Sequence, residues 1–267
     1  MSILKAVILG IIQGFTEFLP ISSSGHLVLL QRVFGLEEQM LSFDVILHLG
    51  SLVAVFAVFW KDIFDLVKKP FQNLTYMLII ATIPAVIAGF LLKNQIGSLF
   101  EGGIFLAFGF LFTGALLIYS DKIPRGEKHE MDVKLSDALV IGCVQAIAIT
   151  PGISRSGSTI TAGLHQGLSR ETAARFSFLL SIPTILGAAV MTVSDVLGSP
   201  EGANILLSAG ALPMVFGFFA ALLSGYLSIR FMLDIIKKYK LRYFGYYVFV
   251  LAGFILADIF ITKIFFF

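Results

Sequence analysis

Charged residues are scarce in this chain. Asp, Glu, Lys and Arg together make up 13% of its 267 residues, whereas an average soluble domain has about 25%. Hydrophobic residues make up 57%, and apolar stretches long enough to cross a bilayer recur along the chain. The composition excludes an ordinary soluble domain and predicts an all-α integral membrane protein.

Cysteine is almost absent, because Cys143 is the only one. A single cysteine excludes an internal disulfide and cannot form a cysteine metal cluster. The net charge of +2 says little about partners, because the position of the charges matters more than their sum in a membrane protein. We expect membrane lipids as partners and no nucleic acid.

The first 19 residues lack the marks of a cleaved signal peptide. Gln13 and Glu17 interrupt the apolar region, Lys5 is the only basic residue, and no cleavage site of small residues follows. We therefore expect this segment to belong to the mature protein.

Polar side chains are concentrated in residues 13–26, between two apolar runs. Pro20 and Gly25 would break a helix there, and neither flanking run, residues 3–18 or 27–36, reaches the ~20 residues of a membrane span. A helix, a break and a short returning helix predict a re-entrant hairpin. Its irregular backbone must be buried in protein or line a cavity.

The second half repeats this plan in weaker form. Residues 135–149 are apolar, residues 150–157 break the helix, and a short run continues to residue 168. A shift that places Gly10 on Gly142 also places five further residues on identical ones: Gln13, Ile21, Ser22, Ser24 and Gly25 on Gln145, Ile153, Ser154, Ser156 and Gly157. Further on, Ile83-Pro84 resembles Leu212-Pro213. This recurrence in order predicts an internal duplication.

About six transmembrane spans are expected besides the two hairpins: residues 41–60, 74–93, 101–120, 171–194, 205–229 and 243–262. A polar linker, residues 121–134, separates halves at approximately 1–120 and 135–267 within a single membrane domain. Because each hairpin returns to its starting side and three spans follow, each half ends opposite its start. The halves must then be inverted, an arrangement that forms a site at the midplane between broken helices.

Basic residues are distributed unevenly over this topology. One side receives only Lys5, Arg32, Lys93 and Lys263. The other receives Lys61, Lys68, Lys69, Lys122, Arg125, Lys128, Lys134, Arg170, Arg175, Arg230, Lys237, Lys238, Lys240 and Arg242. The rich side is expected to be cytoplasmic. Both termini and the mouth of the first hairpin should therefore face the outside, or the periplasm.

Gln13 and Glu17 are four residues apart, so they share one helix face. An ionised Glu17 at membrane depth needs a cation, either a metal ion or Arg155. A metal ligand or a general base is our first interpretation of Glu17. A structural hydrogen bond that ties the two hairpins together is the alternative.

Ser22, Ser23 and Ser24 lie in the first break, where the free N–H groups of the next helix can bind an anion. Serine is also a common N-cap and turn residue, so at least one of the three is expected to be a cap. His26 lies just inside the returning helix. It could face the same site, or it could be structural.

Arg155 lies at the second break, flanked by Ser154, Ser156 and Gly157. Its guanidinium offers a rigid fork of donors that matches phosphate oxygens, and glycine lets the backbone approach a ligand closely. Phosphate binding is our first interpretation. The alternative is a buried salt bridge to Glu17 that joins the hairpins without a ligand.

Asp44 and His48 lie one turn apart at the outer end of the first span. We expect an interfacial or structural role, with the entrance to the site as the alternative place.

These motifs resemble those of the bacterial undecaprenyl-pyrophosphate phosphatases, a membrane family associated with bacitracin resistance. Gln13 and Glu17 match a motif of Glu or Gln, three residues, then Glu. Residues 20–26 match Pro-x-Ser-Ser-x-Gly-His, and residues 151–157 match Pro-Gly-x-Ser-Arg-Ser-Gly. The resemblance covers essentially the whole chain. Some members carry glutamate at the position of Gln13, so a mechanism that needs two carboxylates on that helix is not expected here.

The resemblance implies an enzyme that dephosphorylates the C55 polyprenyl diphosphate to the monophosphate and so recycles this lipid carrier for cell-wall synthesis. It also implies a divalent cation, Mg²⁺ or Ca²⁺. By position the catalytic residues would be Glu17, Ser23, His26 and Arg155, with Glu17 also a metal ligand. The substrate contacts would be Gln13, Ser22, Ser24, Ser154, Ser156 and Gly157. Attack by Ser23, by His26 or by a metal-bound water stays open.

A transporter or flippase for polyprenyl phosphate or a small anion is the competing hypothesis, because paired re-entrant hairpins in inverted repeats are typical of transporters. The chemistry-capable cluster favours the enzyme. The expected location is the bacterial inner (plasma) membrane, and the sequence leaves open whether the chain forms a homodimer.

Overall fold

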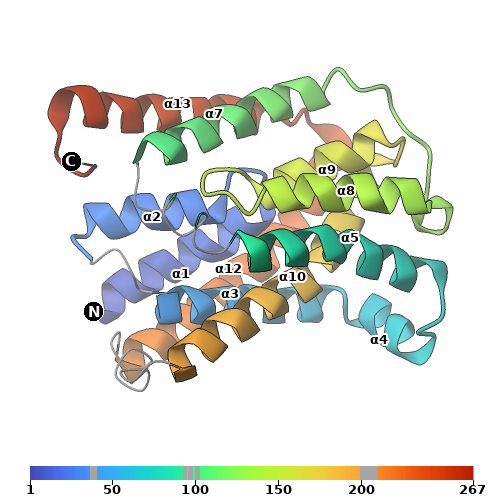
Figure 1. Cartoon of the computed structure of the whole chain (residues 1–267), viewed down its shortest axis with the longest axis horizontal. Helices are drawn as coiled ribbons and strands as arrows, with labels where there is room; N and C mark the ends of the chain where they lie inside the picture. Colours follow the sequence, from blue (N-terminus) through green and yellow to red (C-terminus); the bar gives the residue numbers. More distant parts are fainter. Residues whose placement is uncertain (37–40, 93–94, 96–98, 100–102, 199–209, 267) are drawn as a thin grey trace.

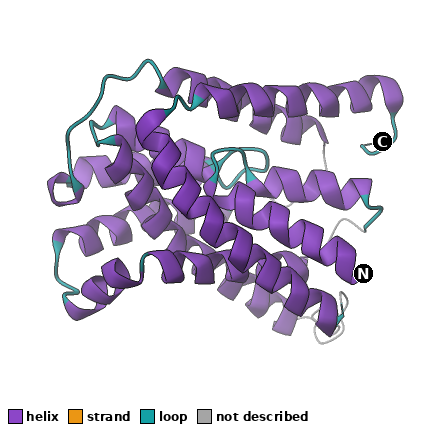
Figure 2. Ribbon diagram, turned by 180° about the vertical axis from the view of Figure 1, so that it is seen from behind, coloured by secondary structure: helices purple, strands orange, loops and turns teal. Residues whose placement is uncertain are grey.

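Helices make up nearly all of the computed structural model, which describes residues 1–36, 41–92, 95, 99, 103–198 and 210–266 (Figure 1). These residues form helices joined by loops, and no strand occurs among them (Figure 2). Five of the helices are long and apolar enough to cross a membrane, or six if the bent pair α3 and α4 counts as one span. The chain is a multi-pass, all-α membrane protein, as predicted.

The first hairpin consists of α1 (Ile3–Phe18) and α2 (Ser23–Val33). Helix α1 ends just before Pro20, where the proline ring prevents a further turn. Helix α2 begins four residues earlier than the expected residue 27, because the side chain of Ser22 accepts a hydrogen bond from the N–H of Gly25 and caps the helix. The two helices are therefore linked by a very short break.

The second hairpin consists of α8 (Leu135–Ile147) and α9 (Arg155–His165). Its returning helix is capped in the same way, since the side chain of Ser154 accepts from the N–H of Gly157. In Figure 1 the two hairpins enter from opposite ends of the molecule, and their tips meet near the middle. Both helical hairpins predicted from the sequence are present, and their re-entry into the membrane stays a prediction.

The predicted spans correspond to six long helices: α3 (Leu41–Val58), α5 (Asn73–Leu91), α7 (Gly103–Ser120), α10 (Arg170–Gly198), α12 (Ala211–Lys238) and α13 (Arg242–Ala257). A π-helical turn, Asp258–Thr262, extends α13. The predicted end of the fifth span at residue 229 was wrong, because α12 continues to Lys238. Residues 205–209 of that predicted span lie outside the described residues.

Helix α4 (Trp60–Lys68) was not predicted. It follows α3 after a bend of 80°. Lys61 and Asp62 ended the predicted span, but Trp60, Phe64 and Val67 follow at helical spacing and are exposed on one face. This pattern is typical of an amphipathic helix that lies along a surface.

Several helix contacts of one half correspond to those of the other. If each helix is exchanged for its counterpart in the other half, the following helix pairs result again. Helix α1 packs on α12 and α8 packs on α5, so the entering helix of each hairpin packs on a span of the other half. Helix α3 likewise packs on α12, α10 packs on α5, and α7 pairs with α13. This pattern supports the inverted duplication, which stays a prediction.

The proposed correspondence between Pro84 and Pro213 was wrong as to their positions in the helices. Pro84 lies inside α5, whereas Pro213 lies in the first turn of α12. The two prolines therefore occupy different positions along their helices.

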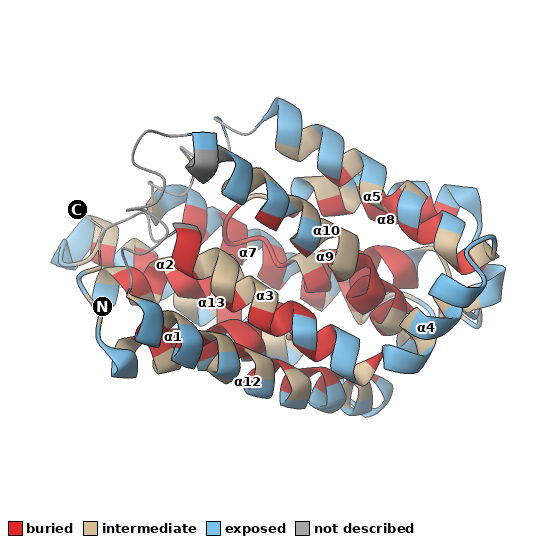
Figure 3. Ribbon diagram, turned by 90° about the horizontal axis from the view of Figure 1, so that it is seen from below, coloured by how far each residue is buried: buried red, intermediate tan, exposed pale blue. Residues whose placement is uncertain are grey.

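The outer faces of the bundle are apolar. Buried residues line the interior and exposed ones the outside (Figure 3), and the exposed set includes Phe90 at 74% and Val250 at 72% of their full exposure. Soluble proteins rarely expose apolar surface on this scale, so these faces suit lipid. Both chain ends lie at one end of the molecule, and α4 and the linker lie at the other (Figure 1).

Gly14 is required where α1 contacts α12. A Cβ atom there would collide with the Ser224 hydroxyl and with the backbone of Ala221 and Gly225. We predict that Gly14→Ala destabilises the protein by about 1–3 kcal/mol, the usual cost of overpacking, measured as a lower Tm in detergent. Gly89→Ala is the control, because a Cβ atom at Gly89 meets nothing within 4 Å. Equal Tm values for the two variants would contradict this packing.

Candidate active site

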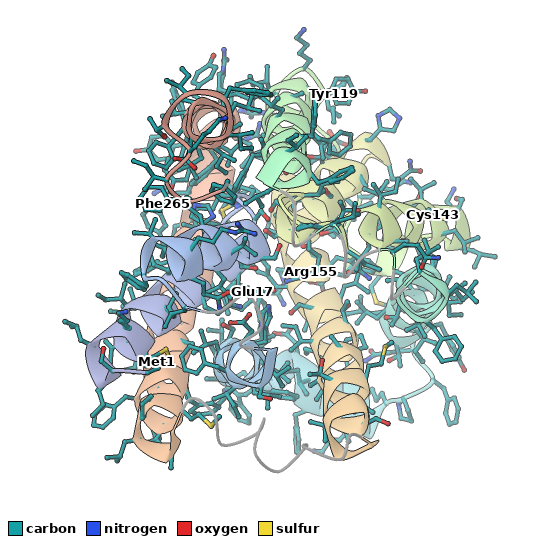
Figure 4. All side chains as sticks on the ribbon, turned by 60° about the vertical axis from the view of Figure 1, so that its left-hand side comes forward. Met1, Glu17, Tyr119, Cys143, Arg155 and Phe265 are labelled. Atoms are coloured by element: carbon teal, nitrogen blue, oxygen red, sulfur yellow. The ribbon has the colours of Figure 1, made fainter. Side chains whose placement is uncertain are left out.

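The carboxylate of Glu17 is the point where the two hairpins meet. It lies in the last turn of α1, and its side chain is only 5% exposed. Its Oε1 accepts from Nη2 of Arg155 at 2.9 Å. Its Oε2 accepts from Oγ of Ser23 at 2.6 Å and from Nε2 of Gln13 at 3.0 Å. Figure 4 shows Glu17 and Arg155 facing one another at the centre of the surrounding helices.

Arg155 has donors beyond those that the protein uses. Its Nη2 binds Glu17, and its Nη1 donates to the carbonyl of Ser177 at 3.2 Å. A guanidinium carries five N–H groups, and these bonds occupy one on each of two nitrogens. The salt bridge that was the alternative interpretation is therefore present, while further N–H groups of the same side chain can bind an anion.

Two helices begin at residues whose side chains contact this carboxylate. Ser23 is the first residue of α2, and Arg155 is the first residue of α9. The first turn of a helix has unsatisfied N–H groups and a partial positive charge, which together bind anions. The site therefore combines one arginine with two positive helix ends around one buried carboxylate.

The other serines mainly shape the two breaks. Besides the capping by Ser22 and Ser154, the hydroxyl pairs Ser22–Ser24 and Ser154–Ser156 lie at 3.3 and 3.2 Å. Ser156 also donates to the carbonyl of Leu19 at 3.0 Å, which joins the two hairpin tips. A Cβ atom at Gly157 would lie 3.2 Å from Pro20 of the opposite tip. The predicted contacts of these residues with substrate stay predictions.

His26 lies away from the carboxylate. Its Nδ1 donates to the carbonyl of Ser22 at 2.7 Å, because a carbonyl can only accept. Its Nε2, the acceptor of a neutral ring, lies 2.9 Å from the hydroxyl of Tyr247 on α13. The ring also stacks on Tyr247 and meets the edge of Phe110. Both nitrogens are occupied, so the structure does not bring His26 together with Ser23 and Glu17.

His48 is a neighbour of the carboxylate that the sequence analysis did not assign to the site. Its Nε2 lies 3.7 Å from Oε2 of Glu17, and its side chain is 30% exposed. The carboxylate of Asp44 turns instead to Nε2 of Gln31, at 2.7 Å. The only sequence feature that could have indicated His48 was its one-turn spacing from Asp44. Their helix, α3, lies beside α1 through tertiary packing, which a sequence pattern does not reveal.

A buried aromatic cluster closes the site on the side of α4. The rings of Phe18 and Phe178 pack edge to face at 5.6 Å, and that of Phe59 lies 6.3 Å from Phe178. The guanidinium of Arg175 lies over Phe59 and pairs with Asp62 at 2.5 Å and with Glu130 at 2.6 Å. These ion pairs fasten α4 and the linker across this end of the bundle.

The oxygen donors around Glu17 fit a hard divalent cation. Gln13 is fully buried, and its Oε1 has no hydrogen-bond partner among the residues that the structure describes. A half-turn of this amide would therefore place Oε1 beside Glu17 and lose only the bond from Nε2. In the part of the chain that is described, no three His, Cys, Asp or Glu side chains form a metal cluster. Mg²⁺ is usually held by one or two carboxylates together with substrate phosphates, so this donor set suits it.

Comparison with known proteins identifies the family of this chain. The model of the family described as "Bacitracin resistance protein BacA" matches residues 6–254. The chain belongs to this family.

Several relatives of this family member carry one name. A protein of Carboxydothermus hydrogenoformans, named undecaprenyl-diphosphatase, is 45% identical over 96% of this chain and 97% of its own length. One of Methanosphaera stadtmanae, with the same name, is 42% identical over 92% of this chain and 94% of its own. A Bacillus cereus protein named undecaprenyl-diphosphatase 3 is 43% identical over 99% of this chain and 100% of its own length.

Removing the charge of Arg155 should destabilise the fold, because Glu17 would be left buried without its cation. We predict that Arg155→Met costs about 3 kcal/mol, in line with broken buried ion pairs, measured as a loss of Tm in detergent. Arg125→Met, in the exposed linker, is the matched control. If Arg155→Met is as stable as this control, the ion pair does not hold the hairpins together.

Proposed function

We propose that this protein removes the terminal phosphate of undecaprenyl diphosphate and releases undecaprenyl phosphate and inorganic phosphate. The observation that carries this proposal is the contact of Ser23 with Glu17 at 2.6 Å, beside Arg155 and two helix N-termini. A hydroxyl next to a base and opposite a phosphate-binding fork is an arrangement for phosphoryl transfer, which needs mainly positioning and electrostatic stabilisation. The names of the relatives support this substrate.

Ser23 is the nucleophile in this proposal, and Glu17 is its general base. The Ser23 oxygen attacks the terminal phosphorus, its proton passes to Glu17 Oε2, and the bridging P–O bond breaks to release undecaprenyl phosphate. Water then attacks the phosphoserine, and the Ser23 oxygen leaves with the proton held by Glu17. Both protons of the attacking water stay on the released inorganic phosphate. Both residues return to their starting state.

Arg155 and the two helix starts hold the diphosphate oxygens and stabilise the charge on the transferred group. A divalent cation, Mg²⁺ or Ca²⁺, would neutralise further charge on the diphosphate when it is bound, with Glu17, Gln13 and substrate oxygens as its ligands. Serines of the two breaks line the same space.

His26 is a positioning residue in this proposal. Ser22 has φ 69°, a backbone conformation that serine rarely adopts, and its carbonyl is held by Nδ1 of His26. Tyr247 fixes the other side of the ring. His26 therefore holds the break in the shape that presents Ser23 to Glu17.

Glu17→Gln tests the proposed chemistry. The amide keeps the size of the side chain but cannot take a proton from Ser23, so we predict a loss of at least ~100-fold in phosphate release. Binding of the lipid diphosphate should persist. The measurement is phosphate release from undecaprenyl diphosphate by purified protein in detergent, with Mg²⁺ or Ca²⁺ present and binding followed separately.

Glu127→Gln, in the exposed linker, is the control and should keep wild-type activity. Full activity of Glu17→Gln would remove Glu17 from the mechanism. A wild type that releases no phosphate with any divalent cation, but carries lipid phosphate across liposomes, would establish the transporter instead.

The reaction is expected on the outer face of the inner membrane. The end that holds both termini is poor in basic residues, and the cluster of Phe18, Phe59 and Phe178 closes the opposite end. The basic end is expected to face the cytoplasm. The mouth of the first hairpin then opens outward.

Cysteine labelling tests this orientation. In a Cys143→Ser background, Ser2→Cys should react with a membrane-impermeant maleimide added to intact cells. Lys122→Cys, in the linker, should react only after the membrane is permeabilised. The reverse pattern would place the site on the cytoplasmic face.

A further inference from the structure

The ring of His48 is held so that one nitrogen faces the active-site carboxylate. Its Nδ1 lies 2.7 Å from the backbone carbonyl of Asp44, and because a carbonyl only accepts, Nδ1 carries the hydrogen. In the neutral ring Nε2 then has the free lone pair, and this atom lies 3.7 Å from Oε2 of Glu17. Histidines that bind metals typically donate their other N–H to a carbonyl or carboxylate in this way.

Oε2 of Glu17 is the common neighbour of three potential ligand groups, the side chains of Ser23, Gln13 and His48. Ser23 and Gln13 contact it at 2.6 and 3.0 Å, and the buried Oε1 of Gln13 has no hydrogen-bond partner within the described ranges. His48 adds the only nitrogen with a lone pair that we find beside it in the described part of the chain. Arg155 binds the other oxygen, Oε1, so its charge lies on the far side of the carboxylate.

Two carboxylates, those of Asp44 and Glu17, interact electrostatically with this ring. The Asp44 carboxylate accepts from Nε2 of Gln31 through Oδ1, and the hydrogen bond between Asp44 and His48 is the one to the Asp44 backbone carbonyl. A charged His48 ring that simply pairs with Glu17 is the competing interpretation, because the two side chains lie within 4 Å. The two interpretations differ in one measurable property, which is whether Nε2 binds a metal ion.

We propose that His48 is a nitrogen ligand of the divalent cation in this site, which completes a donor set with Glu17 and Gln13. The inference rests on the proposed function, which supplies the need for a cation. An all-oxygen site suits Mg²⁺ and Ca²⁺, whereas an imidazole ligand raises the affinity for transition metals along the Irving–Williams order. His48 therefore gives this enzyme a preference for Mn²⁺ over Mg²⁺.

The test measures cation binding directly. Full-length protein in detergent, stripped of metal by a chelator, is titrated with Mn²⁺ and with Mg²⁺ in the presence of methylenediphosphonate, a diphosphate analogue that cannot be hydrolysed. We expect His48→Gln to weaken Mn²⁺ binding at least ~10-fold, as ligand-shell changes usually do, and to change Mg²⁺ binding much less. Pulsed electron paramagnetic resonance of bound Mn²⁺ should show coupling to an imidazole nitrogen in the wild type and none in the variant.

His165→Gln is the matched control, because His165 is exposed and contacts only Tyr119 among the interactions found for it. It should keep both the affinities and the nitrogen coupling of the wild type. Absence of Mn²⁺ binding in the wild type, or an unchanged Mn²⁺ to Mg²⁺ affinity ratio in His48→Gln, would overturn the proposal. An equal fall of the Mn²⁺ to Mg²⁺ affinity ratio in His48→Gln and in His165→Gln would also overturn it.

Phosphate release by the wild type separates this inference from the proposed function. If the wild type releases phosphate and the affinity ratio of His48→Gln is unchanged, the role of His48 is wrong and the phosphatase stands. If nitrogen coupling is present but no phosphate is released with any cation, the metal ligand is supported and the phosphatase is wrong.

Discussion

A single buried carboxylate determines how the two hairpins of this protein are joined. Burying the charge of Glu17 among apolar helices is costly unless it is paired and hydrogen-bonded. The first hairpin supplies Gln13 and Ser23, and the second supplies Arg155. Neither hairpin alone satisfies both oxygens. The contacts that join the hairpins at Glu17 are therefore the same contacts that, in the proposed mechanism, prepare a nucleophile, a base and an anion-binding group.

The proposed duplication explains why these groups converge and why there is one site. The shift that places Gly10 on Gly142 also places Ser23 on Arg155, and each of these two residues begins its returning helix. The same shift places Glu17 on Ile149, so the second hairpin has no carboxylate at the position that corresponds to Glu17. A second buried carboxylate close to Glu17 would repel it and leave a single arginine to serve both. Under the proposed duplication, divergence at these two positions makes the site asymmetric.

Much of this arrangement could be predicted from sequence because it depends on local chemistry. Pro20 stops α1, serine caps start α2 and α9, and the length of the apolar runs separates hairpins from spans. Side-chain direction could not be predicted, because it depends on distant helices. His26 turns to Tyr247 on α13, and His48 reaches Glu17 only because α3 packs on α1. Helix α4 was missed for a different reason: its charges ended the apolar run, although its spacing was amphipathic.

The surroundings of the carboxylate favour one-sided chemistry over transport. Inverted hairpins alone would suit a carrier, whose site must open to each face in turn. Here the side chain of His48 is 30% exposed and that of Glu17 is 5% exposed, whereas the opposite direction is closed by Phe18, Phe59 and Phe178. Passage through that end would require these rings to separate, and Arg175 would have to leave two acidic partners on different segments. In the proposed function the cluster shields the carboxylate from one face, and the diphosphate of a lipid anchored in the other leaflet reaches it from the side of His48. The packed rings and the ion pairs of Arg175 therefore suit the proposed hydrolase better than a carrier that must open to each face in turn.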